Sequence, residues 1–443
     1  MSGLAERRGP QKATPPAAVI SPARAAAFEL LERIAATSAH SDDLLHGPRL
    51  AGLSQVDRDL TTTLVLGVLR WQIALDARLR PLLSRPDLRL SEPVAIALRM
   101  GAFQLLHLQR IPAHAALNES VELVRAAGHP HAAGMVNALL RKLLSLPPVR
   151  KPLFETTATM AERLGHPLWL AERWTTAYGR AAAEAVCAFD QQQPGCGELF
   201  GPVAPAGSGT PDEAMPLMDA GSRLVAELAA ASRPEAKRVW DCCAAPGGKT
   251  IVLGRRLPGA ALLATDNSPV RLKRLAQRLE RDGLGAAVET VQADAAELPE
   301  DRGLFDLILC DVPCSGTGTL ARNPEIRHRL QPEELKRQAT RQQKLLSGAV
   351  KHLAPGGRLL YSTCSLEPEE NEAVVAATLK GLPEGLVIEQ RSVVPLLIDM
   401  RAKGKLFCSE QQLAGLTRGE VLRTLPGSGL EGDGFFAALL ARV

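Results

Sequence analysis

The stretch GRLLYSTCSLEPEEN, from Gly357 to Asn371, contains the change from strand to helix around which the rest of the chain is organised. Its apolar residues 359–361 predict a strand, and Pro368 followed by two glutamates is typical of a helix N-terminus. Cys364 lies between the two, on a loop of the kind where open α/β sheets bind their ligands. A lone cysteine is most often a small buried apolar residue, so its interpretation depends on the other motifs of the chain.

The alternation of strand and helix extends over the second half of the chain, after Asp219. This pattern is typical of a parallel sheet with crossover helices. Strands are predicted at 237–242, 261–265, 286–292, 305–311, 357–362, about 385–390 and 434–441, and helices at 221–231, 248–257, 269–282, 333–353 and 368–380. Seven strands in this order predict a Rossmann-like α/β domain over residues 219–443.

The first third of the chain reads as helix throughout. Apolar residues recur at three- and four-residue steps between Leu60 and Leu79, which makes one apolar stripe. Residues 94–108 are apolar nearly all round and predict a central, buried helix. We therefore expect an all-α helical bundle over residues 21–147.

Two further segments complete the predicted organisation. Residues 1–20 contain no continuous apolar core and are expected to form a flexible tail. Residues 148–218 are expected to form a connector, with two helical pieces around Trp169 and Trp174. The glycine- and proline-rich stretch 191–211 that follows is too polar to form much core.

The composition excludes several classes of protein. A hydrophobic fraction of 46% and a charged fraction of 23% are typical of a globular protein, and no run approaches the roughly 18 apolar residues of a membrane helix. The N-terminus has no signal peptide, and the eight cysteines contain no CxxC pair, so we expect a cytoplasmic protein without metal. The net charge of +4 is compatible with a nucleic-acid partner but does not identify one.

A glycine loop, DCCAAPGGKT from Asp241 to Thr250, follows the first predicted strand. Its small residues let a ligand approach the backbone, and the helix that follows presents free N–H groups to an anion. The spacing fits neither GxGxxG nor a P-loop, which disfavours a dinucleotide site and an NTPase site.

Acidic residues end four successive predicted strands. Any one of them alone is most often a helix N-cap, but the set points to a nucleoside ligand without phosphates. S-adenosylmethionine has the matching carboxylate, ribose diol and adenine amino group. The candidate cofactor-binding residues are Cys243, Ala244, Ala245, Pro246, Gly247, Gly248, Lys249, Asp266, Asp294 and Asp311.

Several short sequence segments in the first third of the chain resemble the NusB-like RNA-binding domain in their order and spacing. They are Asp57-Arg58, Gly67 to Arg70, Pro112 to Glu119 and Val136 to Arg141. Each residue by itself is an ordinary helix or turn residue. The resemblance implies an RNA partner for residues 21–147.

The motifs of the second half resemble the RNA cytosine-C5 methyltransferases. The sequence DVPCSG from Asp311 follows AAPGGK from Ala244 and precedes the Ser-Thr-Cys-Ser motif at 362–365. Together with the NusB-like N-terminal domain, these motifs make the chain resemble the Sun/Fmu/RsmB branch of this family, which modifies 16S ribosomal RNA. The resemblance extends over about residues 21–443 and implies methyl transfer from S-adenosylmethionine to carbon 5 of a cytosine.

The resemblance also assigns roles to the candidate catalytic residues. Cys364 would add to carbon 6 of the base, which makes carbon 5 nucleophilic. Asp311 would hold the base edge as charge moves into the ring, and Cys314 would serve elimination and product release. Lys249 would face the base or lower a thiol pKa. DNA cytosine-C5 methyltransferases use the Pro-Cys thiol as nucleophile instead, and the Thr-Cys-Ser motif is what favours Cys364.

We expect the partner to be 16S rRNA, unassembled or in a partly assembled small subunit, bound by a monomer. The base must leave its stack to reach a thiol, so the RNA must be gripped around it. The candidate RNA-contacting residues are Arg271, Lys273, Arg274, Arg278, Arg322, Arg327, Arg329, Lys336, Arg337, Arg341 and Lys344. The alternative interpretation of each is an ordinary solvated residue on a helix face.

One departure from the family pattern leaves alternatives open. The fuller RNA-binding segment that relatives carry before the catalytic domain is missing, and Met218-Asp219 stands where Gln-Asp is usual. The alternatives are the same chemistry on tRNA or another RNA, and an RNA-binding ribosome assembly factor with weak methylation.

Overall fold

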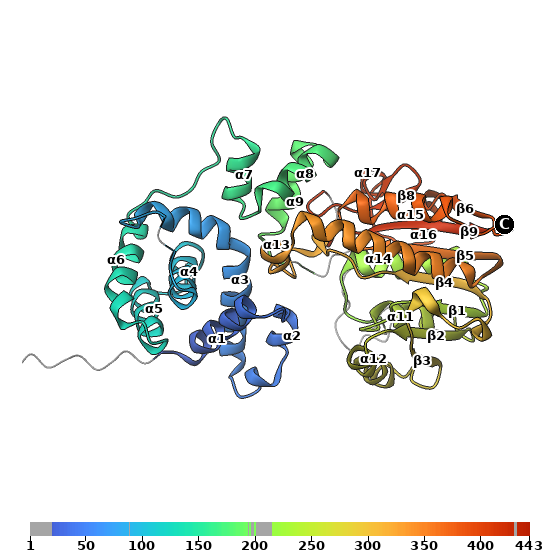
Figure 1. Ribbon diagram of the computed structural model, residues 1–443, viewed down its shortest axis with the longest axis horizontal. Helices are drawn as coiled ribbons and strands as arrows, with labels where there is room; N and C mark the ends of the chain where they lie inside the picture. Colours follow the sequence, from blue (N-terminus) through green and yellow to red (C-terminus); the bar gives the residue numbers. More distant parts are fainter. Residues whose placement is uncertain (1–19, 88, 194, 196–198, 201–214, 429–431) are drawn as a thin grey trace, which may run out of the picture. The chain divides into compact units, whose positions relative to one another are not determined.

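The computed structural model describes residues 20–87, 89–193, 195, 199–200, 215–428 and 432–443. The predicted tail, apart from residue 20, and much of the stretch 191–211 therefore lie outside the described residues. The chain divides into two compact units, one up to Arg150 and one from Lys151. Figure 1 labels their helices and strands.

The first unit is helical, as the sequence predicts. Its elements are α1 (Pro22–Ala36), α2 (Ser41–Leu45), η1 (Pro48–Leu50), α3 (Gln55–Leu79), η2 (Arg80–Leu82), α4 (Glu92–His107), α5 (Ala113–Ala126), η3 (Pro130–Ala132) and α6 (Ala133–Leu144). Helix α4 packs against α1, α3, α5 and α6 and buries most of its apolar residues, which confirms it as the central helix. Because its faces are all covered, it shows no single apolar stripe in the sequence.

Gly67 allows α3 and α4 to approach each other closely. A Cβ atom at this position would lie 2.0 Å from Cζ of Phe103, a buried residue of α4. We expect Gly67→Ala to lower the free energy of unfolding by about 1–3 kcal/mol, because the Phe103 ring must leave its rotamer. The change is measured by urea unfolding of the whole chain.

The matched control is Gly134→Ala on α6, where a Cβ would meet nothing within 4 Å. This variant gains helix propensity and should be unchanged or more stable, by up to about 1 kcal/mol. Equal losses in the two variants would contradict the steric explanation for Gly67.

The second unit is built on a nine-stranded sheet. Its strands are β1 (Arg238–Asp241), β2 (Ala261–Asp266), β3 (Val288–Gln292), β4 (Phe305–Asp311), β5 (Leu353–Thr363), β6 (Ile388–Arg391), β7 (Thr417–Arg418), β8 (Val421–Arg423) and β9 (Phe436–Arg442). The order is β3-β2-β1-β4-β5-β9-β8-β7, with β6 also paired to β9. The strands from β3 to β5 are parallel, and β9 runs antiparallel to β5. The seven predicted strands are present, and β7 and β8 are two short additions.

Helices cover both faces of this sheet, so alternate residues of each strand enter different cores. Leu307 and Leu309 of β4 pack with α10 (Ala220–Ser232), α11 (Gly248–Arg256), α12 (Pro269–Arg281) and α16 (Val394–Ala402). Ile308 and Cys310 pack with α14 (Pro332–Lys351) and α15 (Glu372–Lys380). Burial on both faces explains the continuous apolar runs of the central strands. The fold confirms the predicted Rossmann-like class.

Two local predictions differ from the structure. The helix expected from Pro368 begins instead with the 3-10 turn η7 (Pro368–Glu370), and α15 starts at Glu372. The side chains of Glu370 and Asn371 turn inward to the Cys364 loop, and Asn371 leaves the helical conformation with φ −112° and ψ −102°.

The connector also differs, because it contains three helices and one of them carries both tryptophans. These helices are α7 (Thr157–Arg163), α8 (Leu168–Tyr178) and α9 (Arg180–Phe189). They share a core with Leu320 and Leu366, which flank the two cysteine loops. Trp174 donates to Oε1 of Glu367 at 3.0 Å and thereby ties α8 to the loop after Cys364. The remaining helices of the unit are the short α13 (Ile326–Arg329) and α17 (Glu410–Gly415), and the other 3-10 turns are η4 (Ala295–Glu297), η5 (Glu300–Arg302) and η6 (Thr317–Thr319).

Candidate active site

The two cysteines singled out in the sequence meet at the carboxyl ends of β4 and β5. These strands are parallel neighbours, and their register pairs Asp311 with Ser362. The loops that follow therefore leave the sheet side by side, and the sulfur atoms of Cys314 and Cys364 lie 3.2 Å apart. Both are free thiols and both are partly buried. The site therefore contains two reduced thiols in direct contact.

Lys249 brings a cation to the same place. It lies in the first turn of α11, and its Nζ atom is 2.7 Å from Oδ2 of Asp311. Ser362 donates to the other oxygen of that carboxylate at 2.7 Å. Burial opposes the charge on Lys249, but attraction to Asp311 and to a charge on Cys364 outweighs it and raises the lysine pKa. The ammonium therefore stays charged beside Asp311 and the thiols.

The two thiols have different environments. The hydrogen bond with Cys364, burial and the negative charge of Glu370 together raise the pKa of Cys314 well above its usual value. Cys314 therefore keeps its proton and lies in hydrogen-bond contact with the Cys364 sulfur.

The glycine loop forms a tight turn between β1 and α11. Ala244 donates its N–H to the carbonyl of Thr265 at 2.8 Å, which ties the turn to the end of β2. Gly247 has φ +99°, and a Cβ there would lie 2.5 Å from Cδ1 of Leu275. Ala245 and Pro246 lie between these positions, joined by a cis peptide bond, and Gly248 starts α11. Cys243 is half-buried, and burial raises its thiol pKa well above the usual value.

Asp241 and Asp266 are buried at the ends of β1 and β2, on either side of this turn. Burial raises the pKa of Asp241 to about 7, against the effect of a hydrogen bond from Thr250. Its Oδ1 atom is buried without a partner in the described part of the chain. Asp266 accepts from the N–H of Ser268 at 2.8 Å and pairs with Arg271 at 3.0 Å.

Asp294 follows β3 and caps the helical turn after it, which is the most frequent role of an aspartate at the end of a strand. Its Oδ1 atom accepts from the N–H of Ala296 at 2.9 Å and so caps the turn η4. The structure thus brings Asp311, Lys249, Cys314 and Cys364 into one cluster. The glycine loop with Asp241 and Asp266 forms a turn beside it.

The candidate RNA-contacting residues divide into buried or ion-paired residues and exposed residues. Arg327 is 2% exposed and donates to the carbonyls of Gly165 and Asp190, so its expected surface role is wrong. Arg322 bridges Asp219 and Asp433. The exposed members are Arg271, Lys273 and Arg274 on α12, and Lys336, Arg337, Arg341 and Lys344 on α14.

The sequence analysis missed the side chains that hold the two cysteine loops together. Glu370 was interpreted as a first-turn helix residue, yet it is fully buried and accepts hydrogen bonds from Ser315 and Ser365. The available signal was the position of both serines, each directly after a candidate cysteine.

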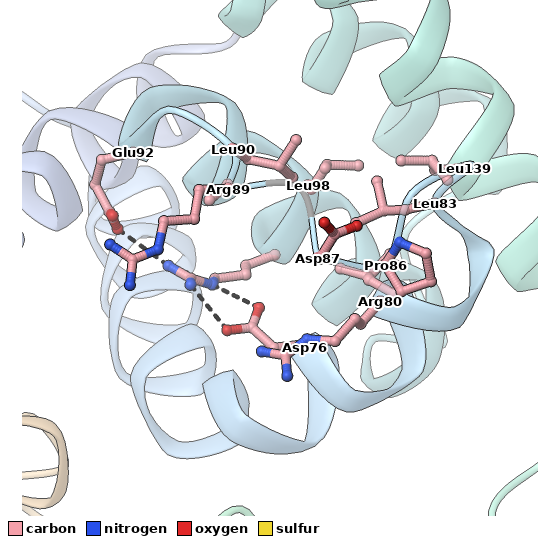
Figure 2. Close-up of a pocket in the computed structure, with 13 residues that line it drawn as sticks. Asp76, Arg80, Leu83, Pro86, Asp87, Arg89, Leu90, Glu92, Leu98 and Leu139 are labelled. Carbon is pink, nitrogen blue, oxygen red and sulfur yellow. Dashed lines mark hydrogen bonds and ion pairs between the residues drawn. The ribbon is translucent and has the colours of Figure 1, made fainter.

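A separate cavity of about 400 Å³ lies in the helical unit and is lined by none of these residues. Figure 2 shows Asp76 and Glu92 in its wall, with leucines from several helices. Arg99 pairs there with Asp76 at 2.8 Å and with Glu92 at 3.0 Å.

Comparison with known proteins identifies the family. The model of the 16S rRNA methyltransferases RsmB/F matches residues 229–441, and the model of the NusB family matches residues 21–145. Ribosomal RNA small subunit methyltransferase B of Klebsiella pneumoniae (strain ATCC 700721 / MGH 78578) is 31% identical over 425 residues, which are 88% of this chain and 91% of that protein. The chain belongs to the RsmB/F family. It is therefore a methyltransferase with a NusB domain in front, as the sequence resemblance implies.

One further relative agrees with this assignment, and one solved structure shares the fold. The probable ribosomal RNA small subunit methyltransferase B of Bacillus subtilis (strain 168) is 30% identical over 399 residues, 81% of this chain and 88% of that protein. The crystal structure of PH0851 matches with a TM-score of 0.68 and 21% identity, over 95% of this chain and 99% of that one. At this identity the match shows a shared fold.

Two features are absent from the described residues. None of the helices there is long and apolar enough to cross a membrane. Within the same residues, no group of three or more His, Cys, Asp or Glu side chains could hold a metal ion.

Proposed function

We propose that this RsmB/F chain transfers a methyl group from S-adenosylmethionine to carbon 5 of a cytosine in 16S rRNA, through a covalent bond between Cys364 and carbon 6. The observation that carries the proposal is the contact of the Cys314 and Cys364 sulfurs at 3.2 Å, beside the Lys249–Asp311 pair at 2.7 Å. Two thiols and an acid suit a reaction that adds a nucleophile and later removes a proton. The cytoplasmic location and the monomeric state stay predictions.

The turn between β1 and α11 fits S-adenosylmethionine. Gly247 and Gly248 keep side chains away from the backbone, and the unpartnered Oδ1 of Asp241 can accept from the ligand's amino group. Asp266 at the end of β2 suits a ribose diol. When bound, the cofactor supplies an electrophilic methyl group.

The protein side chains would perform the remaining steps on the base. The Cys364 thiolate adds to carbon 6, and the Asp311 carboxylate, held by Lys249 and Ser362, accepts a hydrogen bond from the exocyclic amine of the base. The Lys249 ammonium beside it offsets the negative charge that enters the ring. After methylation, carbon 5 carries both a methyl group and a proton. Cys314, in contact with Cys364, would remove that proton, and the electron pair then expels the Cys364 thiolate.

The titration of Asp241 predicts a pH dependence of cofactor binding. Below pH 7 the carboxyl is mostly neutral, because burial raises its pKa to about 7, and above pH 7 it is ionised and attracts a cationic amino group. We expect the affinity for S-adenosylhomocysteine to rise about tenfold between pH 5.5 and 7.5. Calorimetric titration of the wild type measures this change.

Asp241→Asn should remove the pH dependence, whereas Asp301→Asn, at an exposed position in η5, should retain it. A wild-type affinity that does not change with pH would contradict the assigned role of Asp241.

The substrate is tested with tritiated S-adenosylmethionine and three RNAs: free 16S rRNA, 16S rRNA in the small subunit, and tRNA. We expect methyl transfer to one cytosine of free 16S rRNA, located by bisulfite sequencing. Transfer to tRNA alone would replace 16S rRNA as the substrate. RNA binding without any methyl transfer would contradict the proposal and favour an assembly factor.

A further inference from the structure

A buried carboxylate lies between the two cysteine loops. Glu370 is 0% exposed, at the end of η7. Its Oε1 atom accepts from the backbone N–H of Ser315 and from Nε2 of Gln342, both at 2.9 Å. Its Oε2 atom accepts from the hydroxyls of Ser315 and Ser365. All these donors are uncharged.

The donors belong to the residues that follow the two thiols. Ser315 follows Cys314 and Ser365 follows Cys364, so one carboxylate joins the two loops one residue away from each sulfur. The serine hydroxyls are themselves 3.1 Å apart. A change in the position of either loop would break a hydrogen bond to Glu370.

Backbone contacts continue the connection beyond the carboxylate. Gly318 donates its N–H to the carbonyl of Cys364 at 2.9 Å, and Leu366 donates to Oγ1 of Thr317 at 2.9 Å. A Cβ at Gly318 would lie 2.9 Å from the Cys364 oxygen, so the loops touch without a side chain between them. The loops are held closely, and Glu370 supplies the polar part of that contact.

Glu370 is itself held from two sides. Tyr361 of β5 donates its hydroxyl to the Glu370 carbonyl at 2.7 Å. Gln342 of α14 donates to Glu370 and, at 3.0 Å, to the carbonyl of Pro313, directly before Cys314. The carboxylate is therefore fixed to the sheet and to α14, and both cysteine loops are fixed to the carboxylate.

A buried carboxylate whose donors are neutral is costly for folding, since water must be removed from a charge. A core of equal volume is more stable when it is built from apolar side chains. A buried carboxylate is therefore most often retained for a task at a functional site.

We propose that Glu370 is a positioning residue that holds Cys314 and Cys364 in contact, so that the second thiol reaches carbon 5 while the first is bonded to carbon 6. The inference rests on the two-thiol reaction proposed above. Glu370 acts through Ser315 and Ser365, to which it is hydrogen-bonded, and not through a hydrogen bond to either sulfur.

The electrostatics agree with this geometry. The hydrogen bond with Cys364, burial, the charge on Cys364 and, after these, the Glu370 charge raise the pKa of Cys314. The same carboxylate that positions the loop thus also favours the protonated form of Cys314 while Cys364 is the nucleophile.

The test compares three variants. Glu370→Ala removes the carboxylate, whereas Glu370→Gln retains its shape. In Glu370→Gln the amide oxygen can accept from the N–H groups of Ser315 and Gln342, and the two serine hydroxyls turn to accept from the amide N–H₂ group. The control is Glu369→Ala, at the adjacent residue, whose side chain is 46% exposed and pairs with Arg173. Thermal unfolding and S-adenosylhomocysteine binding verify that each variant folds.

The first measurement needs neither RNA nor cofactor. Phenylarsine oxide bridges two thiols that lie in contact, and its binding is corrected by the value for a variant with both Cys314 and Cys364 replaced by serine. We expect Glu370→Ala to bind it at least about tenfold more weakly than the wild type, since the second thiol is no longer held at the first. Glu370→Gln and Glu369→Ala should stay within about threefold.

The second measurement follows single-turnover reactions on RNA. In Glu370→Ala we expect release of methylated RNA from the covalent complex to slow about 10²-fold, with a KM for RNA close to the wild-type value. Partial unfolding would reduce the number of active sites and leave this ratio of formation to release unchanged. Ser365→Ala, a milder variant, should change the ratio in the same direction if Glu370→Ala fails to fold.

The proposal would be overturned if Glu370→Ala bound phenylarsine oxide and released methylated RNA as the wild type does. It would also be overturned if Glu370→Gln bound the arsenical no more tightly than Glu370→Ala. If the wild type forms no covalent RNA complex, the proposed chemistry is wrong, and the arsenical measurement still decides whether Glu370 positions the thiols.

Discussion

Replacing Cys364 by alanine is expected to abolish methyl transfer, with a loss of at least about 10⁴-fold, because the reaction then has no nucleophile for carbon 6. Carbon 5 of cytosine does not react with a methyl donor until a group adds to carbon 6.

The measurement uses RNA in which 5-azacytidine replaces cytidine. Nitrogen at ring position 5 blocks elimination, so an enzyme that adds a thiol to carbon 6 stays covalently bound to the RNA. We expect a complex that resists denaturing gel electrophoresis for the wild type and none for Cys364→Ala. The control is Cys408→Ala, which removes another free, partly buried thiol outside the cluster. A trapped complex in Cys364→Ala would reverse the assignment of the two cysteines.

The second large effect is expected from Cys314→Ala, which should form the bond to carbon 6 but fail to break it. This variant should accumulate a covalent complex with ordinary RNA and S-adenosylmethionine, where the wild type shows little. Product release should fall by at least about 10²-fold, the lower range for loss of a general base.

The change in Cys314 during the reaction has a physical explanation. The largest cause that raises its pKa is the hydrogen bond with Cys364, followed by burial and the charge on Cys364. When Cys364 bonds to the base, it becomes a neutral thioether and that charge disappears. The Cys314 pKa then falls, the thiol releases its proton to solvent, and the thiolate takes the proton from carbon 5 at the stage when a base is needed.

The rate of complex formation and the rate of RNA release, measured separately in rapid-quench experiments, test this sequence of events. Cys314→Ala should retain the first rate within about tenfold and lose the second. A variant that turns over normally would show that a different group removes the proton.

Much of the fold could be predicted because its signals are local. The central strands are buried on both faces and therefore appear as continuous apolar runs, and the apolar residues of α3 recur at helical spacing in the sequence. The strands β7 and β8 have two and three residues, too few for a periodic pattern, and were not predicted. The start of α15 was predicted too early, because the inward hydrogen bonds of Glu370 and Asn371 are tertiary contacts.

The candidate site could be predicted only in part. The motifs around Asp241, Asp311 and Cys364 identified the loops at the strand ends, where ligands bind in this class of fold. They did not reveal that Arg327 is buried, because a basic residue in a polar stretch gives the same local pattern inside or outside. They also did not reveal Glu370 as the link between the loops.

The sequence by itself determined the helical class of the first unit, the α/β class of the second unit and the loops that carry the candidate side chains. Only the tertiary structure decided that Cys314 and Cys364, fifty positions apart in the chain, have their sulfurs 3.2 Å apart, with Lys249 2.7 Å from Asp311 beside them. The physical reason is that hydrophobic periodicity records which face of an element is buried. The distance between two loops is set by the register of the neighbouring strands β4 and β5, and by the hydrogen bonds of a carboxylate from a third segment.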